Sequence, residues 1–168
     1  MIESADHKYG LTIDRLRKLL RYDRCTGNFH WNSSGKLGGF IQQGKGTYRR
    51  IGVDGRYYLA HRLAWFYVKR VWPKNELDHM DGDGLNNSLS NLRECGRTGN
   101  NGNRVASKNS KSGAKGVHWN KVNRKWIAQM KNKKGNRYLG SYSILSDAIT
   151  AYNASAVLYF GEFARASQ

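Results

Sequence analysis

The 168-residue chain contains little cysteine, few acidic residues and no long apolar run. Its two cysteines, Cys25 and Cys95, lie far apart and form no Cys-x-x-Cys pair, which argues against a zinc ribbon or finger. The first ten residues lack the apolar segment of a signal peptide. No stretch approaches the roughly 18 apolar residues of a membrane span. We therefore expect a cytoplasmic protein with free thiols that does not contact a membrane.

The shortage of acidic residues leaves a large positive charge. Lys and Arg number 29 against 12 Asp and Glu, which gives a formal net charge of +17. Solubility needs a net charge of only about 2–8 in a small domain, and a polyanion would relieve the mutual repulsion of the surplus. The charge therefore predicts a nucleic-acid-binding protein. A ribosomal-type RNA binder and a merely basic surface are the alternatives.

Helical and strand patterns are mixed along the first part of the chain, which predicts an α+β fold. Apolar residues recur at helical spacing from Ile13, and Thr12 can cap that helix. Residues 48–60 alternate as a hairpin would, with the turn at Asp54-Gly55. A second helix is predicted over 61–71. We interpret these elements as DNA-contacting parts of a first domain that extends to residue 105.

The end of the chain has a second regular pattern. Residues 106–114 are small, polar and basic, which is typical of a linker. Beyond them we predict a three-stranded antiparallel sheet packed on one helix, which Ser143 or Ser146 caps and which runs to about Phe160. The strands are expected at 115–120, 125–132 and 137–142. The predicted parts are thus 1–105, a linker at 106–114, and a domain at 115–168.

The most informative segment lies between residues 75 and 104 and is rich in Asn, Asp and Gly. It contains the adjacent pair Asp78 and His79. Hydrolysis of a phosphodiester needs a base for the attacking water and positive charge at the phosphate. A neutral imidazole suits the first task, and a divalent cation held by carboxylate and amide oxygens suits the second.

Other interpretations of the same segment are weaker. A calcium-binding loop is excluded because Leu85 and Leu92 stand where oxygen ligands would be needed. We expect the polar residues of this loop to form turns through Asx-type hydrogen bonds. These turn-forming residues are Asp81, Asp83, Asn86 and Asn87. His61 could be catalytic, but its place at a helix start beside apolar residues favours a structural role.

The segment resembles the HNH (ββα-metal) endonucleases, specifically the small phage and intron-encoded homing group. The matching stretches are HRLAW at 61–65, LDHMDGDGLNNSLSNL at 77–92 and GNNGNR at 99–104. The resemblance implies a ββα-metal core in which His79 is the general base, Asp78 binds the metal, and Asn91 braces the loop and orients the histidine.

The same resemblance implies that the second metal ligand is Asn100, although Asn101 or Asn103 could take that position. A neutral amide ligand favours Mg²⁺ or Mn²⁺ over zinc. Arginines are well suited to contact phosphate. Arg93, Arg97 and Arg104 are therefore candidate DNA ligands, with a solvated basic face as the alternative for Arg93 and Arg97.

The last 55 or so residues resemble the DNA-binding domain of plant ethylene-response factors. The matching landmarks are Gly116-Val117, Trp119, Lys125-Trp126, Ala128, Leu139-Gly140, Ala148, Ala151-Tyr152, Ala156, Phe160-Gly161 and Ala164. The resemblance implies a sheet that enters the major groove of duplex DNA. Its candidate contacts are Trp119, Lys121, Arg124, Trp126, Lys131 and Arg137. Trp126 could instead be a core residue under the helix.

These observations together predict a metal-dependent HNH homing endonuclease that acts on double-stranded DNA. We expect a monomer, encoded by a phage or mobile element and present in the cytoplasm of a bacterial host. The alternative is a non-catalytic, sequence-specific DNA-binding regulator with a decayed nuclease core. The sequence leaves open the target site and whether one strand or both are cut.

Overall fold

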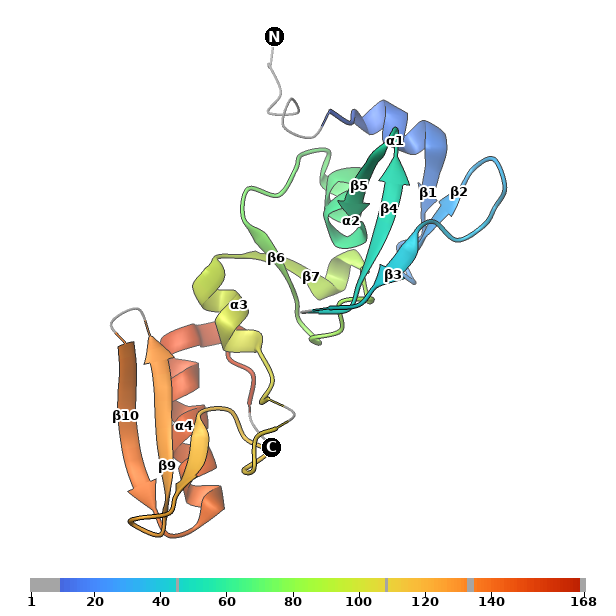
Figure 1. Ribbon diagram of the computed structural model, residues 1–168. Coiled ribbons are helices and arrows are strands. Elements are labelled where there is room, and N and C mark those ends of the chain that lie inside the picture. The colour runs from blue at the N-terminus through green and yellow to red at the C-terminus, as the bar shows by residue number, and fades with distance from the viewer. Residues whose placement is uncertain (1–9, 45, 108, 133–134, 167–168) are drawn as a thin grey trace. The chain divides into compact units, whose positions relative to one another are not determined.

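The computed structural model describes residues 10–44, 46–107, 109–132 and 135–166 (Figure 1). The chain folds into two compact units, Met1–Gly96 and Arg97–Gln168, and each has its own apolar core. Within the described ranges, no helix is both long and apolar enough to cross a membrane.

The first unit begins with a short helix that runs directly into a strand. α1 (Ile13–Leu19) starts at Thr12, whose hydroxyl accepts a 3.2 Å hydrogen bond from the Arg15 amide, as predicted. The helix ends where Leu20 becomes extended, with φ −132° and ψ 140°. β1 (Leu20–Tyr22) then pairs antiparallel with β2 (Phe29–Trp31).

A three-stranded sheet and a helix complete the core of the first unit. β3 (Phe40–Gln42), β4 (Tyr48–Val53) and β5 (Arg56–Leu59) lie in that order. The predicted hairpin is confirmed, and Asp54 and Gly55 turn it with φ values of 49° and 75°. α2 (Ala60–Lys69) contacts β4 and β5. Its Leu63 and Phe66 are fully buried beside Ile51.

The last elements of the first unit are two short strands. β6 (Glu76–His79) and β7 (Leu92–Cys95) pair antiparallel, with Asp78 opposite Arg93 and His79 opposite Leu92. The 3-10 helix η2 (Leu89–Asn91) precedes β7. The predicted ordered loop with short elements is therefore confirmed over this stretch.

The second unit consists of a three-stranded antiparallel sheet, a long helix and two short helical elements. β8 (Val117–Asn120), β9 (Lys125–Asn132) and β10 (Gly135–Tyr142) pair in the order β10-β9-β8, as the sequence predicts. α4 (Leu145–Phe160) covers one face of this sheet (Figure 1) and is followed by η3 (Gly161–Phe163). The helix begins after Ile144, and no described side chain caps it, so the predicted cap by Ser143 or Ser146 is wrong.

The division of the chain differs from the predicted one. α3 (Arg97–Asn103) packs against α4 and η3 and so lies in the second unit, whereas the sequence assigns it to the first domain. The predicted linker is also partly built into the second unit. Ala114 lies in its core, and the buried Ser112 hydroxyl donates a 2.6 Å hydrogen bond to the carbonyl oxygen of Val117.

Candidate active site

Asp78 and His79 are the polar end of β6, and both are buried. Asp78 is 5% exposed and His79 is 6% exposed. Across the strand pair, Arg93 donates from Nε at 2.9 Å and from Nη2 at 2.8 Å to the same oxygen, Oδ2 of Asp78. A carboxylate this buried needs such compensation. The pair therefore fixes the orientation of the Asp78 carboxylate, one residue before His79 in the strand.

The ring of His79 is held by Asn87. The distance from His79 Nε2 to Asn87 Oδ1 is 3.2 Å, and Asn87 is 0% exposed. The other end of this amide donates to the carbonyl oxygen of Leu85 at 3.0 Å. Because Nδ2 must be the donor to Leu85, Oδ1 faces the ring and the proton lies on Nε2. The neutral ring then carries its basic lone pair on Nδ1.

Asn91 braces the loop that follows β6. Its Oδ1 accepts a hydrogen bond from the Asp81 amide at 3.1 Å. Its Nδ2 donates at 2.9 Å to both the Asp81 carboxylate and the carbonyl oxygen of Asn86. The predicted bracing is thus present. The predicted hydrogen bond from Asn91 to His79 is wrong, because Asn87, four residues earlier, makes it.

The loop between β6 and η2 is built from Asx turns, as predicted. The Asp81 carboxylate accepts from the Asp83 amide at 2.8 Å, and Asp83 accepts from the Leu85 amide at 2.9 Å. Burial alone would raise the pKa of Asp81, but hydrogen bonds from Asp83, Asn86 and Asn91 outweigh it and lower the pKa. The loop is thus a hydrogen-bonded frame for the two catalytic candidates.

His61 at the start of α2 packs against the ring of His79. Its ring meets that of His79 edge-to-face, with centroids 5.0 Å apart and planes at 88°. Tyr48 lies 5.5 Å from His61 and 6.0 Å from His79 between ring centroids. Burial, then the positive charges of His79 and Arg62, lowers the pKa of His61 to about 3. His61 is therefore a neutral packing partner, which agrees with the structural role that the sequence favours.

Several predicted site residues belong to the second unit. α3 contains Asn100 and Arg97, whose side chains lie outside the described part of the structure. Asn101 and Arg104 are exposed and Asn103 is buried. The choice among the three asparagines as metal ligand remains a prediction.

The predicted DNA contacts of the second unit fall on two faces of its sheet. Val117 pairs with Ala128 in the core, so the next in-phase pair, Trp119 and Trp126, lies on the same face as α4. The two indole rings meet at 5.1 Å between centroids, and Trp126 packs against the core, as its alternative interpretation expects.

The remaining candidates are distributed differently. Arg137 pairs with the buried Met130 and so shares the helix face, whereas Lys131 is exposed on the opposite face. Lys121 and Arg124 are exposed in the turn between β8 and β9. Of the predicted contacts, Lys131 therefore lies on the sheet face that is opposite α4. Alternation along β8 places His118 on that same face.

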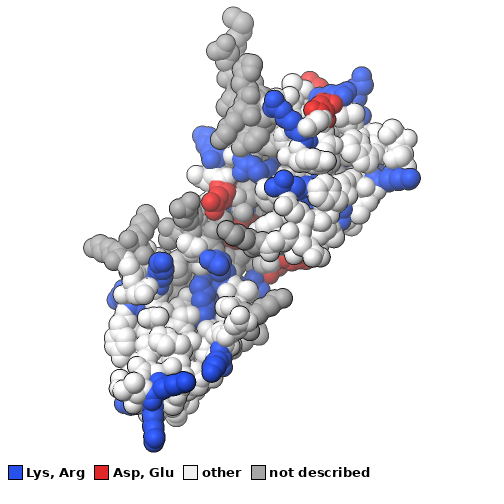
Figure 2. All heavy atoms as spheres, viewed as in Figure 1, with Lys and Arg blue, Asp and Glu red and all other residues white. Residues whose placement is uncertain are grey.

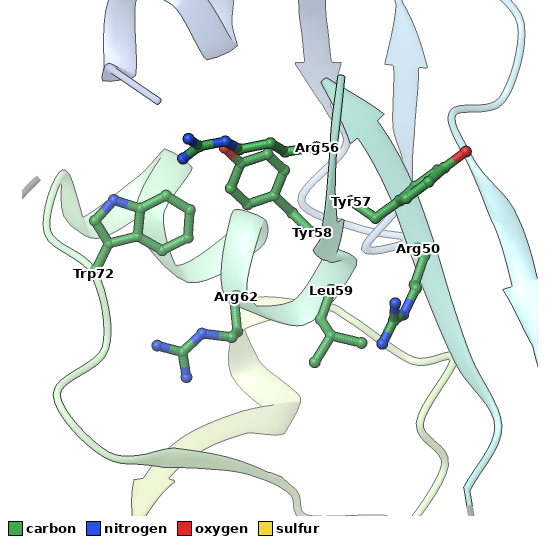
Figure 3. Close-up of a pocket in the computed structure, with 7 residues that line it drawn as sticks. All are labelled: Arg50, Arg56, Tyr57, Tyr58, Leu59, Arg62 and Trp72. Carbon is green, nitrogen blue, oxygen red and sulfur yellow. The ribbon is translucent and has the colours of Figure 1, made fainter. Parts of the chain in front are cut away.

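The first unit has a basic cavity that the sequence analysis missed (Figure 3). Its volume is about 370 Å³ and it is lined by Arg50, Arg56, Tyr57, Tyr58, Leu59, Arg62 and Trp72. Arg62 is oriented by hydrogen bonds to the carbonyl oxygens of Pro73 at 3.1 Å and Asn75 at 3.3 Å. Three guanidinium groups around one hollow suit a phosphate group. The arginines are spread over residues 50–62, and no spacing rule groups them in advance.

Basic side chains also predominate on the visible surface. Figure 2 shows Lys and Arg over both parts of this face, with only scattered Asp and Glu. This distribution agrees with the net charge of +17.

Comparisons with known proteins relate the chain to a family model, a phage protein and a solved structure. The family model described as HNH endonuclease matches residues 58–101, which include the site around Asp78 and His79. Protein 3.8 of Escherichia phage T7 is 32% identical over 114 residues, covering 66% of this chain and 93% of that protein. A solved structure of the HNH homing endonuclease I-HmuI, concerned with its DNA binding and cleavage, has a TM-score of 0.41 and 27% identity. The match covers 52% of each chain, so the chain spans about half the length of that structure.

Proposed function

Since the chain belongs to the family of Protein 3.8 of Escherichia phage T7 and contains an HNH endonuclease domain, we propose that it is a metal-dependent endonuclease acting on double-stranded DNA. The observation that carries the proposal is the pair at the end of β6. A buried carboxylate, Asp78, adjoins an imidazole, His79, which Asn87 holds with its basic nitrogen at Nδ1. That pair lies inside the segment matched by the HNH endonuclease family.

In this proposal, His79 is the general base. Its Nδ1 takes a proton from the water that attacks the phosphorus atom, and the resulting imidazolium donates from Nε2 to Asn87 Oδ1. That hydrogen bond strengthens as the ring becomes charged, so it favours the transition state over the ground state. His61 remains neutral beside the ring, because its pKa is about 3, and so adds no full positive charge that would oppose the protonation.

HNH nucleases generally use divalent metals, and the donors fit a hard cation. Asp78 supplies carboxylate oxygens in a buried position, and Asn100 would supply an amide oxygen. Among the described residues, no group of three or more His, Cys, Asp or Glu side chains is placed to hold a metal ion. A bound Mg²⁺ or Mn²⁺ would stabilise negative charge at the phosphate. Without a metal ion, Arg93 neutralises Asp78. When a metal ion is bound to Asp78, Arg93 can turn to a phosphate oxygen.

The basic surface provides the binding energy for DNA. The cavity formed by Arg50, Arg56 and Arg62 supports phosphate contacts in the first unit, and Lys131 supports them in the second. We infer a phage-type homing role from the family resemblance, and a monomeric enzyme because the sequence has no obvious dimerisation seam. Because phosphate contacts release counterions, the affinity should fall steeply with salt.

Plasmid relaxation tests the proposal. Supercoiled DNA is incubated with the full chain in the presence of Mg²⁺, Mn²⁺ or EDTA. A library of candidate target sites is treated in the same way in parallel. We expect metal-dependent open-circle or linear product, which also reports whether one strand or both are cut. A plasmid and library that both stay intact in Mg²⁺ and Mn²⁺ would overturn the enzyme assignment and leave a non-catalytic DNA-binding protein.

A further inference from the structure

The turn between β1 and β2 packs against the loop that contains Asn87. The hydroxyl of Tyr22, at the end of β1, donates a buried 2.8 Å hydrogen bond to the main-chain oxygen of Asn87. Tyr22 is itself buried, with its ring 5.0 Å from that of Phe29 between centroids. This internal hydrogen bond joins two segments that are 65 residues apart in the chain.

A glycine brings the same turn close to the same loop. Gly27 has φ +72°, and a Cβ added there would overlap the main chain of Asn87 and Ser88. Asp23 fixes the turn, because its carboxylate accepts a 2.9 Å hydrogen bond from the Cys25 amide. The turn therefore supports the loop by close main-chain contact as well as by the hydrogen bond from Tyr22.

The supported residue is the one that orients the proposed base. Asn87 is fully buried and uses both ends of its amide, one toward Leu85 and the other toward His79 Nε2. A shift of the Asn87 main chain would lengthen the 3.2 Å contact to the ring. The two neutral tautomers of an imidazole are close in free energy, so a single hydrogen bond is enough to select between them.

We propose that Tyr22 is a positioning residue for His79. It acts through Asn87: its hydroxyl holds the main chain of Asn87, the amide oxygen of Asn87 holds the proton on Nε2, and Nδ1 is left as the basic nitrogen. The role in catalysis rests on the proposed function. The choice of tautomer does not rest on the proposed function, because it is a property of the protein without DNA or metal.

Two variants isolate the Tyr22 hydroxyl. Tyr22→Phe removes one oxygen and keeps the ring that packs on Phe29. Tyr67→Phe is the matched control, since its ring lies 5.7 Å from that of Tyr22 in the same aromatic cluster. Within the described residues no hydrogen bond involves the Tyr67 hydroxyl. Asn87→Ala serves as the reference for a ring that has lost its acceptor.

The first readout is the ¹⁵N spectrum of His79 in the full chain at pH 8.5, without DNA or metal. In the wild type and in Tyr67→Phe we expect widely separated Nε2 and Nδ1 shifts, typical of one tautomer. In Tyr22→Phe the two shifts should move toward each other, in the direction of Asn87→Ala. Shifts in Tyr22→Phe that equal those of the wild type would overturn the proposal.

The second readout is cleavage by the metal-loaded enzyme. Tyr22→Phe should lower kcat about tenfold with KM little changed, since the hydroxyl acts on the base and not on DNA binding. A loss confined to KM would contradict a positioning role. If the wild type shows one tautomer but cuts no DNA, the proposed function fails and the positioning stands. If it cuts DNA and Tyr22→Phe leaves the tautomer unchanged, only the positioning fails.

Discussion

The buried histidine at the start of α2 should make the first unit sensitive to acid. His61 is 7% exposed, and its pKa is lowered from 6.5 to about 3. Between those pH values the unfolded chain binds a proton at residue 61 that the folded unit does not bind. The contribution of His61 to the free energy of unfolding therefore rises with pH over this window, by about 1.4 kcal/mol per unit, and becomes constant above pH 6.5.

The magnitude at pH 4.5 is large enough to measure. At pH 4.5, two units below 6.5, His61 should lower the free energy of unfolding of the first unit by roughly 3 kcal/mol relative to neutral pH. Domains of this size have total stabilities of about 5–15 kcal/mol. His61→Phe keeps an aromatic ring against His79 and removes the ionisation, so this part of the pH dependence should vanish.

Guanidinium unfolding at pH 7 and pH 4.5 provides the assay. In a background with Trp119→Phe and Trp126→Phe, the other three of the five tryptophans all lie in the first unit, so fluorescence reports that unit alone. Carboxylates titrate in both proteins, and the comparison with His61→Phe cancels them. Parallel losses of stability in the two proteins would refute the assignment of a neutral, buried His61.

Three further outcomes are expected. Asp78→Asn should abolish Mn²⁺ binding in calorimetry while DNA affinity in EDTA is kept, and wild-type metal affinity in that variant would contradict the assigned ligand. Gly116→Ala should destabilise the second unit by several kcal/mol in thermal melts, because a Cβ there would overlap the Tyr152 ring and the Gln129 carbonyl oxygen. Gly113→Ala, with a similar φ of +65° but open space around it, should cost only about 1 kcal/mol. The logarithm of the DNA-binding constant should fall against the logarithm of salt with a slope of about −0.9 per phosphate contact, and a slope near zero would exclude electrostatic binding.

Patterns that depend on neighbouring residues were predictable from the sequence. The Thr12 cap, the turn at Asp54-Gly55 and the three strands of the second unit all follow from local spacing and turn chemistry. The Asx turns after β6 follow likewise from the short polar side chains of that loop. In each case the residues that make the structure lie within a few positions of one another.

Features that depend on tertiary packing were not predictable in this way. Asn87 is one of several turn-forming residues in its loop, and since Asn91 is buried as well, only the hydrogen bond to His79 distinguishes Asn87 from it. The helix of residues 97–103 follows β6 and β7 in sequence, yet packs against α4 and η3. Trp126 satisfies the pattern of a DNA contact and of a core residue equally well, and strand register places it on the helix face.

Cleavage and DNA binding, measured together on His79→Ala, test directly whether His79 is the general base. The control is His118→Ala, which changes an exposed histidine of the second unit. We expect His79→Ala to lose cleavage in Mg²⁺ or Mn²⁺ by a factor of about 100 or more, on the order of what a general base contributes. Its DNA affinity should match that of the wild type, and His118→Ala should still cut. Cleavage by His79→Ala at the wild-type rate would contradict the assignment of His79 as the base.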